Sequence, residues 1–205
     1  MIEVEPVAAA KLFGDRIELA RQYTADLAEH GEILGLIGPQ ELARLWSRHV
    51  VNCGLLAPLI RRGGTVADVG SGAGLPGLVL ALAVPETSFT LIEPMERRVA
   101  WLSEESERLG LENVTVLRAR AEETGIAVDQ VTARAVSALR TLVPNCRGLL
   151  SVGGEMLFLK GASVEDEIAA ARKQLLKAGL RDPEVLVLGE EIGAEPTRVF
   201  RATVV

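Results

Sequence analysis

The order of predicted elements favours an α/β fold with a mainly parallel, doubly wound sheet. After residue 64, short aliphatic segments of strand character alternate with helical segments, and strands joined through helical crossovers run parallel. A glycine-rich turn at residues 70–77 connects the first of these strands to a helix. Aromatic residues make up only 3% of the chain, while the abundant Leu, Val and Ala suit short buried parallel strands.

The first sixty residues are predicted to be helical. Apolar residues recur at helical spacing over residues 7–29, with Gly31 as a stop, and again after Gly38 and Pro39. The predicted strands are residues 65–69, 87–92, 114–117, 128–133, 155–159, 185–188 and 198–204. The predicted helices between them are residues 78–83, 95–109, 139–150 and 165–178.

The last two predicted strands leave little room for a helix, so we expect the sheet to end in an antiparallel pair. We expect residues 1–62 to form a helical extension packed on a core of residues 63–205, within a single structural domain. The 205 residues, 48% hydrophobic and 24% charged, are typical of one soluble domain that needs no metal or disulfide to stabilise its core.

The sequence carries neither a secretion signal at Met1 nor an apolar run of about 18 residues. We therefore expect a cytoplasmic monomer with no membrane partner, in which Cys53 and Cys146 are reduced. The formal net charge of −6 argues against DNA and against indiscriminate binding of nucleic acid, because such binding depends on Lys and Arg that neutralise phosphates.

The glycine-rich turn predicts a ligand site. Gly70, Gly72 and Gly74 let a ligand approach the backbone, and the helix that follows points N–H groups toward it. The third glycine of the dinucleotide pattern G-x-G-x-x-G would fall on Leu75, so that pattern fails. A carboxylate at Asp68 would repel a pyrophosphate, but it can accept hydrogen bonds through ordered water from a cationic amino-acid group.

Glu93 ends the second predicted strand. It follows the first glycine by about 20 residues, where an acid accepts hydrogen bonds from the two hydroxyls of a ribose. Asp68 and Glu93 together suit a nucleoside that carries an amino acid and no phosphate. We therefore predict S-adenosylmethionine as the cofactor.

A set of motifs keeps a common order and spacing over roughly residues 45–161. Its segments are residues 68–77, 89–93, 97–99, 111–114, 118–123, 133–135 and 158–161. They resemble the RsmG family, also called glucose-inhibited division protein B, and the Gly-Leu-Pro-Gly end of the loop is more specific than a generic methyltransferase loop. Residues 35–38 replace the family's usual Asn-Leu-Thr element, as in actinobacterial members, and Val51-Asn52 replaces its usual Asp-Ser.

This resemblance implies a Rossmann-like, class I S-adenosylmethionine-dependent methyltransferase with seven strands. It implies transfer of a methyl group to N7 of one guanine in 16S ribosomal RNA, with the 30S subunit as the context. The transfer is an in-line displacement that requires positioning and exclusion of water. Guanine N7 has a free lone pair, so no general base is required, in agreement with a sequence whose histidines are only His30 and His49.

The resemblance assigns the cofactor contacts residue by residue to Gly70, Leu75, Ala121, Glu122 and Arg134. All five follow or end predicted strands, and open parallel sheets bind ligands at the carboxyl ends of their strands. We expect Glu122 to accept a hydrogen bond from the adenine amino group and Ala121 to offer its backbone N–H to the ring.

Cations beside the cofactor are the candidates for substrate contacts. Arg134 and Lys160 end successive strands, and we expect them to position the substrate, because Arg and Lys are the usual partners of the guanine O6 and N7 edge. The resemblance places the helix of Arg48 and His49 near the site. The residues predicted to bind RNA are Arg48, His49, Arg120 and Lys160.

We also predict a basic face around this crevice, which leads us to expect RNA binding that depends on shape more than on bulk charge. Its predicted members are Arg44, Arg48, Arg61, Arg62, Arg97, Arg98, Arg118, Arg120, Arg134 and Lys160.

Three other functions remain open at this point. A methyltransferase of the same fold could act on another RNA or on a small molecule. A nicotinamide-dependent oxidoreductase is disfavoured by the missing third glycine and by Asp68. A binding module without enzymatic activity would transfer no methyl group to 30S subunits.

Overall fold

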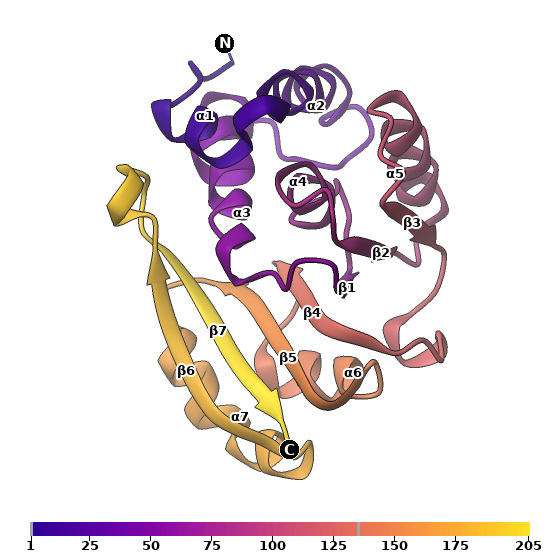
Figure 1. The fold of residues 1–205 in the computed structure, drawn as a ribbon, viewed down its shortest axis with the longest axis vertical. Helices are drawn as coiled ribbons and strands as arrows, with labels where there is room; N and C mark the ends of the chain where they lie inside the picture. The colour runs from indigo at the N-terminus through magenta and orange to yellow at the C-terminus, as the bar shows by residue number, and fades with distance from the viewer. Residues whose placement is uncertain (1, 135) are drawn as a thin grey trace.

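A seven-stranded sheet with helices on both faces organises the chain (Figure 1). The computed structural model describes residues 2–134 and 136–205, so Ala135 of the 133–135 motif lies outside the described residues. The strands are β1 (Thr65–Val69), β2 (Ser88–Ile92), β3 (Val114–Leu117), β4 (Val128–Arg134), β5 (Leu150–Lys160), β6 (Leu180–Leu188) and β7 (Thr197–Val204).

The strand order is β3-β2-β1-β4-β5-β7-β6. The first five strands pair in parallel, whereas β7 lies antiparallel between β5 and β6. The predicted mainly parallel sheet with an antiparallel last strand is confirmed. Because the parallel strands begin at one edge of the sheet, the segments that follow β1, β2, β3, β4 and β5 meet at the opposite edge.

Helices divide between the two faces. The helices are α1 (Val7–Phe13), α2 (Ile17–His30), α3 (Asn52–Gly54), α4 (Gly77–Ala83), α5 (Glu96–Arg108), α6 (Leu139–Arg147) and α7 (Val164–Lys177). The first five lie over one face of the sheet, and α6 and α7 lie over the other (Figure 1). None of the helices in the described part of the chain combines the length and apolar character needed to cross a membrane.

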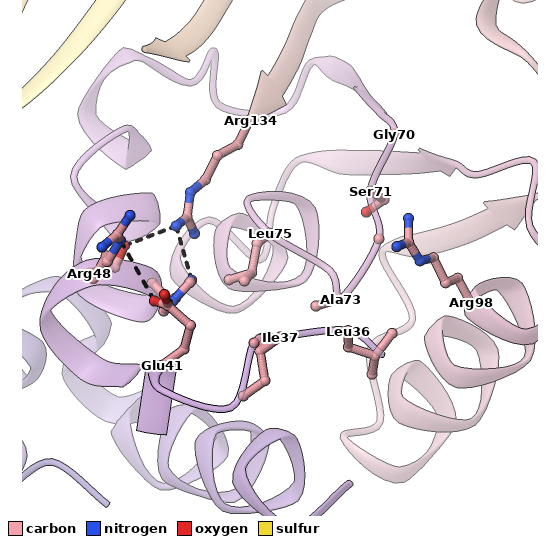
Figure 2. A pocket seen from close by; sticks show the side chains of 13 residues that line it. Leu36, Ile37, Glu41, Arg48, Gly70, Ser71, Ala73, Leu75, Arg98 and Arg134 are labelled. Carbon is pink, nitrogen blue, oxygen red and sulfur yellow. Dashed lines mark hydrogen bonds and ion pairs between the residues drawn. The ribbon is translucent and has the colours of Figure 1, made fainter. Parts of the chain in front are cut away.

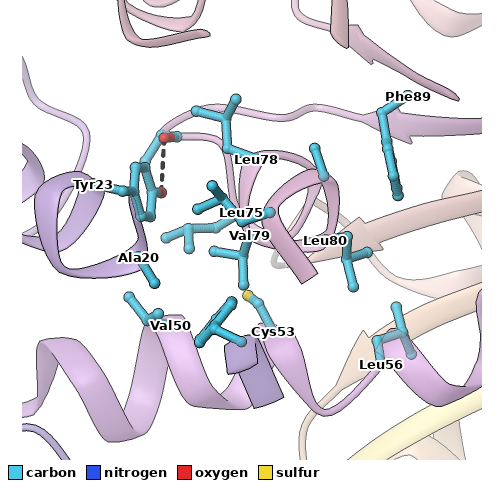
Figure 3. Packing of buried hydrophobic residues seen from close by; sticks show 14 of the residues in the cluster. Ala20, Tyr23, Val50, Cys53, Leu56, Leu75, Leu78, Val79, Leu80 and Phe89 are labelled. Carbon is cyan, nitrogen blue, oxygen red and sulfur yellow. Dashed lines mark hydrogen bonds between the residues drawn. The ribbon is translucent and has the colours of Figure 1, made fainter. Parts of the chain in front are cut away.

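Each face has its own hydrophobic core. The first core joins the N-terminal helices to α4, so that Tyr23 and Val50 pack in the same cluster as Leu75 and Leu78 (Figure 3). The second core lies under α6 and α7, where the rings of Phe158 and Phe200 stack at a centroid distance of 5.8 Å. The helices of the first sixty residues therefore pack directly against the glycine-rich turn.

The N-terminal helices are less regular than their sequence pattern suggests. The helix predicted over residues 7–29 is interrupted by a 3-10 turn, η1 (Gly14–Arg16), whose first residue has a φ of +48°. The stretch after Pro39 folds as a 3-10 turn, η2 (Glu41–Arg44), and a π-helical turn, η3 (Leu45–Val51). Such π turns occur often at functional sites, and this one carries Arg48 and His49.

Two strands are longer than predicted. β5 begins at Leu150 and β6 at Leu180, whereas the sequence suggested starts at residues 155 and 185. Both added segments are irregular: the pairing register shifts there, and Gly153 has a φ of +82°. Polar residues and glycines interrupt the apolar alternation in these segments, which is why the pattern of the sequence did not reveal them.

Candidate active site

The glycine loop after β1 depends on backbone conformations that other residues rarely adopt. Gly70, Gly72 and Gly74 have φ values of +70°, +58° and +98°. A Cβ atom on Gly74 would lie 2.4 Å from Cδ1 of Leu78, so α4 packs where that side chain would be. The loop therefore requires glycine for its conformation and for the close approach of the following helix.

Asp68 supports this loop from below. Its Oδ2 atom accepts hydrogen bonds from the Ser71 hydroxyl at 2.6 Å and the Gly77 backbone N–H at 3.0 Å, and Oδ1 accepts one from Thr132 at 3.2 Å. Burial raises the pKa of the Asp68 carboxyl to about 6, against the opposing effect of these hydrogen bonds. The carboxylate thus ties the end of β1 to both ends of the loop.

The middle of the loop is anchored by two helices. The carbonyl oxygen of Ala73 accepts hydrogen bonds from the Tyr23 hydroxyl of α2 and from the Trp101 indole N–H of α5, each at 3.0 Å. Figure 3 shows the Tyr23 bond at the edge of the first core. Both side chains are buried, so the position of the loop depends on the packing of α2 and α5.

Glu93, at the end of β2, faces the loop. It is buried, and its carboxylate accepts hydrogen bonds from the backbone N–H groups of Gly72 at 3.0 Å and Met95 at 2.9 Å. Arg98 Nη1 lies 3.9 Å from the same carboxylate. Glu93 therefore links the glycine loop to the start of α5.

Three cavities open along the carboxyl edge of the sheet. Cavity A, of about 330 Å³, lies between the ends of β1, β2 and β3 and helix α6. Cavity B, of about 370 Å³, lies between the glycine loop and the segment 36–49. Cavity C, of about 580 Å³, lies between β4, β5, α3 and α7. Arg134 lines all three, so the cavities meet at its side chain.

A chain of polar contacts holds Arg134 in place. Its guanidinium donates to the carbonyl oxygen of Arg48 at 3.1 Å, to Cys53 Sγ at 3.4 Å and to Nδ1 of His49 at 2.9 Å, and Nε2 of His49 lies 2.6 Å from Glu41 Oε2. Figure 2 shows Arg134 pointing toward Glu41 and Arg48, with Arg98 on the other side of the loop.

This arrangement defines the state of His49. Because Arg134 is always protonated, Nδ1 of His49 must accept, and the ring is neutral with its proton on Nε2, which donates to Glu41. Burial lowers the pKa of His49, the Arg134 charge lowers it further, and the hydrogen bond from His49 lowers the pKa of Glu41. Both nitrogens of the imidazole are thus occupied.

Lys160 ends β5 at the wall of cavity C. Its ammonium donates to the Ser137 carbonyl oxygen at 2.7 Å and to Glu167 Oε2 of α7 at 2.8 Å. Elsewhere in the lining of cavity C, the Asn52 amide donates to the Thr197 hydroxyl at 2.6 Å. A cation and a carboxylate are therefore paired on one wall of this cavity.

The structure brings most of the predicted site residues together along these cavities. Cavity A is lined by Gly70, Glu93, Arg120, Ala121, Glu122 and Arg134. Cavity B is lined by Arg48, His49, Gly70, Gly72, Leu75 and Arg134, and cavity C by Arg48, Arg134 and Lys160. Asp68 lies beneath the loop and supports it, and Gly74 lies within the loop beside α4.

The predicted basic face is partly wrong. Arg61 and Arg62 precede β1 and lie at the opposite edge of the sheet, where they pair with Asp129, Glu155 and Glu86. Arg44 and Arg118 are paired with Glu195 and Glu96. The prediction counted arginines along the chain, but the edge of the sheet at which each arginine lies depends on the fold.

Sequence reasoning missed three residues of the site: Glu41 lines cavity B, Glu167 lines cavity C, and Tyr23 reaches the loop from α2. Arg98, a predicted member of the basic face, lines cavities A and B. Glu167 follows Glu165 and Asp166 on α7, so nothing in the sequence distinguishes it from its neighbours. Glu41 stands apart from other acids in the sequence, but its role depends on the contact with His49. For Tyr23, a signal was present: it is the sole tyrosine of the chain, on the apolar face of a helix.

The fold and the site define a class of protein. A parallel sheet that ends in an antiparallel strand, with a glycine loop after β1 and an acid after β2, is the arrangement of class I S-adenosylmethionine-dependent methyltransferases. The structure of TYW2 from M. jannaschii in complex with AdoMet has this fold: its TM-score is 0.58 at 19% identity, and the match covers 77% of this chain and 76% of that chain.

The family follows from the sequence comparisons. The family model for GidB, rRNA small subunit methyltransferase G, matches residues 16–195. The protein called ribosomal RNA small subunit methyltransferase G in Leifsonia xyli is 58% identical over 205 residues, covering 99% of this chain and 98% of that protein. The protein of the same name in Clavibacter michiganensis is 56% identical, covering 100% and 97%. The chain belongs to this family.

Proposed function

We propose that the chain methylates N7 of one guanine in 16S ribosomal RNA, as a monomer acting on the 30S subunit, with S-adenosylmethionine as the methyl donor. The observation that carries the proposal is the meeting of cavities A, B and C at Arg134. One side offers the glycine loop and acids that suit a nucleoside, and the other offers cations that suit RNA. Membership of the family supports the choice of small-subunit ribosomal RNA.

The lining of cavity A fits the nucleoside half of the cofactor. Val69, Ile92, Met95 and Leu142 supply apolar surface for a planar ring. Glu93 is suited to the ribose hydroxyls, and the exposed Glu122, beside the backbone of Ala121, is suited to an adenine amino group. Gly70 and the loop to Leu75 would hold the amino-acid half, with Arg134 at its carboxylate. The cofactor supplies an electrophilic methyl group on a sulfonium.

The residues of the site are arranged for positioning rather than for proton transfer. Guanine N7 carries a lone pair at neutral pH, so no proton has to be removed before it is methylated. His49 is the histidine of cavity B, and both of its ring nitrogens are already engaged by Arg134 and Glu41. The absence of a free imidazole base in the described lining supports attack by N7 over attack by an amino or hydroxyl group.

The direct test uses 30S subunits from a strain that lacks this protein. The purified chain is incubated with methyl-labelled S-adenosylmethionine and either 30S subunits or free 16S RNA. N7-methylguanosine is then located by chemical cleavage and primer extension. One labelled guanine in 16S RNA, with faster transfer to 30S subunits, is the expected result. Label at a base nitrogen other than N7, or no label in either substrate, would refute the proposal.

A further inference from the structure

Cavity C is larger than cavities A and B and adjoins both of them. It shares Arg134 and Val136 with cavity A, and Arg134 and Arg48 with cavity B. Its volume of about 580 Å³ falls within the range of roughly 300–1,000 Å³ that is usual for small-ligand sites. A planar group placed in it would have one edge at Arg134, where cavity A also opens.

The wall of cavity C formed by β5 and α7 presents a donor next to an acceptor. Lys160 Nζ and Glu167 Oε2 are 2.8 Å apart, and the side chains are only 9% and 22% exposed. Further bonds fix the pair, because Lys160 donates to Ser137 and Glu167 Oε2 accepts from the Leu139 backbone N–H at 3.0 Å. Both contacts of Glu167 use Oε2, which leaves Oε1 as an acceptor for a ligand.

A donor followed by an acceptor, as in Lys160 and Glu167, matches the edge of guanine. Going around guanine from N7, the next groups are the O6 acceptor, the N1–H donor and the N2 amino donor. Adenine presents the reverse pattern at the corresponding positions, with a donor at N6 and an acceptor at N1. A cation followed by a carboxylate therefore favours guanine and leaves unpaired polar groups against adenine.

We infer that cavity C receives the target base of the RNA, turned out of its strand, and that the Lys160–Glu167 pair recognises it as guanine. The inference rests on the proposed function, and it adds which cavity holds the target base and which residues recognise it. Lys160 donates to O6 and Glu167 accepts from N1–H and the N2 amino group, which leaves N7 toward Arg134 and cavity A. Enzymes that modify a base bind it in this way, through its Watson–Crick edge in a fitted pocket.

The remaining walls suit the rest of a nucleotide. Leu159 and Val136 offer apolar surface to the faces of a base. Arg48, whose side chain is 52% exposed, lies at the rim, where it can contact a phosphate of the RNA backbone. Asn52 and Thr197, which are hydrogen-bonded to each other, complete the lining of the pocket.

The first experiment removes the carboxylate and keeps its shape. In Glu167→Gln, the amide oxygen can still accept from Lys160 and Leu139, so the wall is retained while the charged acceptor for N1–H is lost. The matched control is Glu165→Gln, an exposed residue on the first turn of the same helix. We expect Glu167→Gln to lower kcat/KM for 30S subunits by about 10-fold or more and to leave the Kd for S-adenosylhomocysteine within twofold, whereas the control changes neither.

The second experiment measures base preference directly. GMP and AMP are titrated into the protein saturated with S-adenosylhomocysteine, with binding followed by NMR line broadening. We expect GMP to bind about 10-fold more tightly than AMP in the natural sequence, and this ratio to approach one in Glu167→Gln. Equal affinities for GMP and AMP in the natural sequence, or no binding of either at millimolar concentration, would overturn the inference.

These outcomes separate the pocket from the proposed function. If the natural chain methylates N7 of 16S RNA but Glu167→Gln behaves like Glu165→Gln, the pair serves only to hold α6 and α7 together, and the inference fails while the function stands. If no RNA is methylated, the function itself fails. A fall in the unfolding temperature of Glu167→Gln together with a loss of S-adenosylhomocysteine binding would also count against a role in recognition.

Discussion

The two sides of Arg134 are built in different ways. On the side of cavities A and B, proposed for the cofactor, the chain forms the site mainly with backbone: the glycine loop is supported by Asp68 and anchored at Ala73 by buried side chains of α2 and α5. On the side of cavity C, proposed for the substrate, the site consists of long charged side chains, such as the half-exposed Arg48 and Lys160, which is held by the Ser137 carbonyl and Glu167.

This difference between the two sides predicts which amino-acid substitutions each side tolerates. A backbone-shaped site has few alternatives, because a side chain at a position of positive φ strains the loop whatever its chemistry. A site built from side chains can lose one group and keep its shape. We therefore expect substitutions of the loop glycines to weaken cofactor binding strongly, and substitutions in cavity C to separate cofactor binding from turnover.

The largest effect is expected at Gly74. In Gly74→Ala, the new Cβ atom combines a strained φ of +98° with an approach of 2.4 Å to Leu78, and the costs of strain and overpacking sum to about 3 kcal/mol. We expect the Kd for S-adenosylhomocysteine, measured by calorimetry, to rise about 100-fold. The control Gly110→Ala has a φ of +62° with open space around it and should leave this Kd unchanged; equal losses in both variants would contradict the account.

Lys160→Ala tests the other side of the comparison. Loss of the ammonium leaves the Ser137 carbonyl without its side-chain donor and Glu167 without its cation, and we expect kcat/KM for 30S subunits to fall by roughly 30- to 100-fold, about 2–3 kcal/mol. Cofactor affinity should stay within twofold. Lys173→Ala, on the exposed side of α7, is the control. A parallel loss of cofactor affinity and turnover would show that the two sides are not separate.

A carboxyl pair between α2 and α5 makes the stability of the folded chain sensitive to pH. Glu105 is buried beside Asp26 and Arg108, and burial raises its pKa to about 7 from 4.5. Between these pH values the folded chain holds more protons than the unfolded chain, so the free energy of unfolding falls as the pH rises, by about 1 kcal/mol from pH 6 to 8.

Glu105→Gln should remove this part of the pH dependence and raise the free energy of unfolding at pH 8. The measurement is denaturant unfolding at pH 6 and pH 8. Glu104→Gln, on the exposed neighbour, should behave as the natural sequence does. A variant less stable than the natural chain at pH 8 would mean that the ion pair with Arg108 outweighs the burial of the Glu105 charge.

The smallest effect is expected at the anchor of the loop. Tyr23→Phe removes one of the two donors to the Ala73 carbonyl, which contributes about 0.5–1.5 kcal/mol. We expect the Kd for S-adenosylhomocysteine to rise about threefold, and more in the double variant Tyr23→Phe with Trp101→Phe. Trp46→Phe, also in the buried core, is the control. An unchanged Kd in the double variant would show that the two hydrogen bonds to the Ala73 carbonyl do not hold the loop in its binding conformation.

The parts of the molecule that the sequence predicts are those that depend on local pattern. Strand and helix alternation predicts the sheet, and the spacing of Gly70, Gly72 and Gly74 predicts a loop that only glycine can form. The role of Asp68 is harder to predict from the sequence, since a carboxylate beside a glycine loop can face either a ligand or the loop itself. In the structure, Asp68 accepts hydrogen bonds from Ser71 and Gly77.

The parts that the sequence does not predict depend on contacts between distant residues. Arg61 and Arg134 are both arginines beside a strand of the same sheet, but one precedes β1 and the other ends β4, which places them at opposite edges. Lys160 donates to the carbonyl oxygen of Ser137, 23 residues earlier in the chain. Such pairings follow from the path of the chain, which short-range periodicity does not encode.

The place of β7 in the sheet has a consequence for the order of assembly. β6 is made before β7, yet it hydrogen-bonds to β7 alone, and β5 has an open edge until β7 inserts. During synthesis, the strands around the glycine loop can pair early, whereas Thr197, which closes cavity C against Asn52, arrives with β7. The nascent chain therefore completes the glycine loop and cavity A before cavity C.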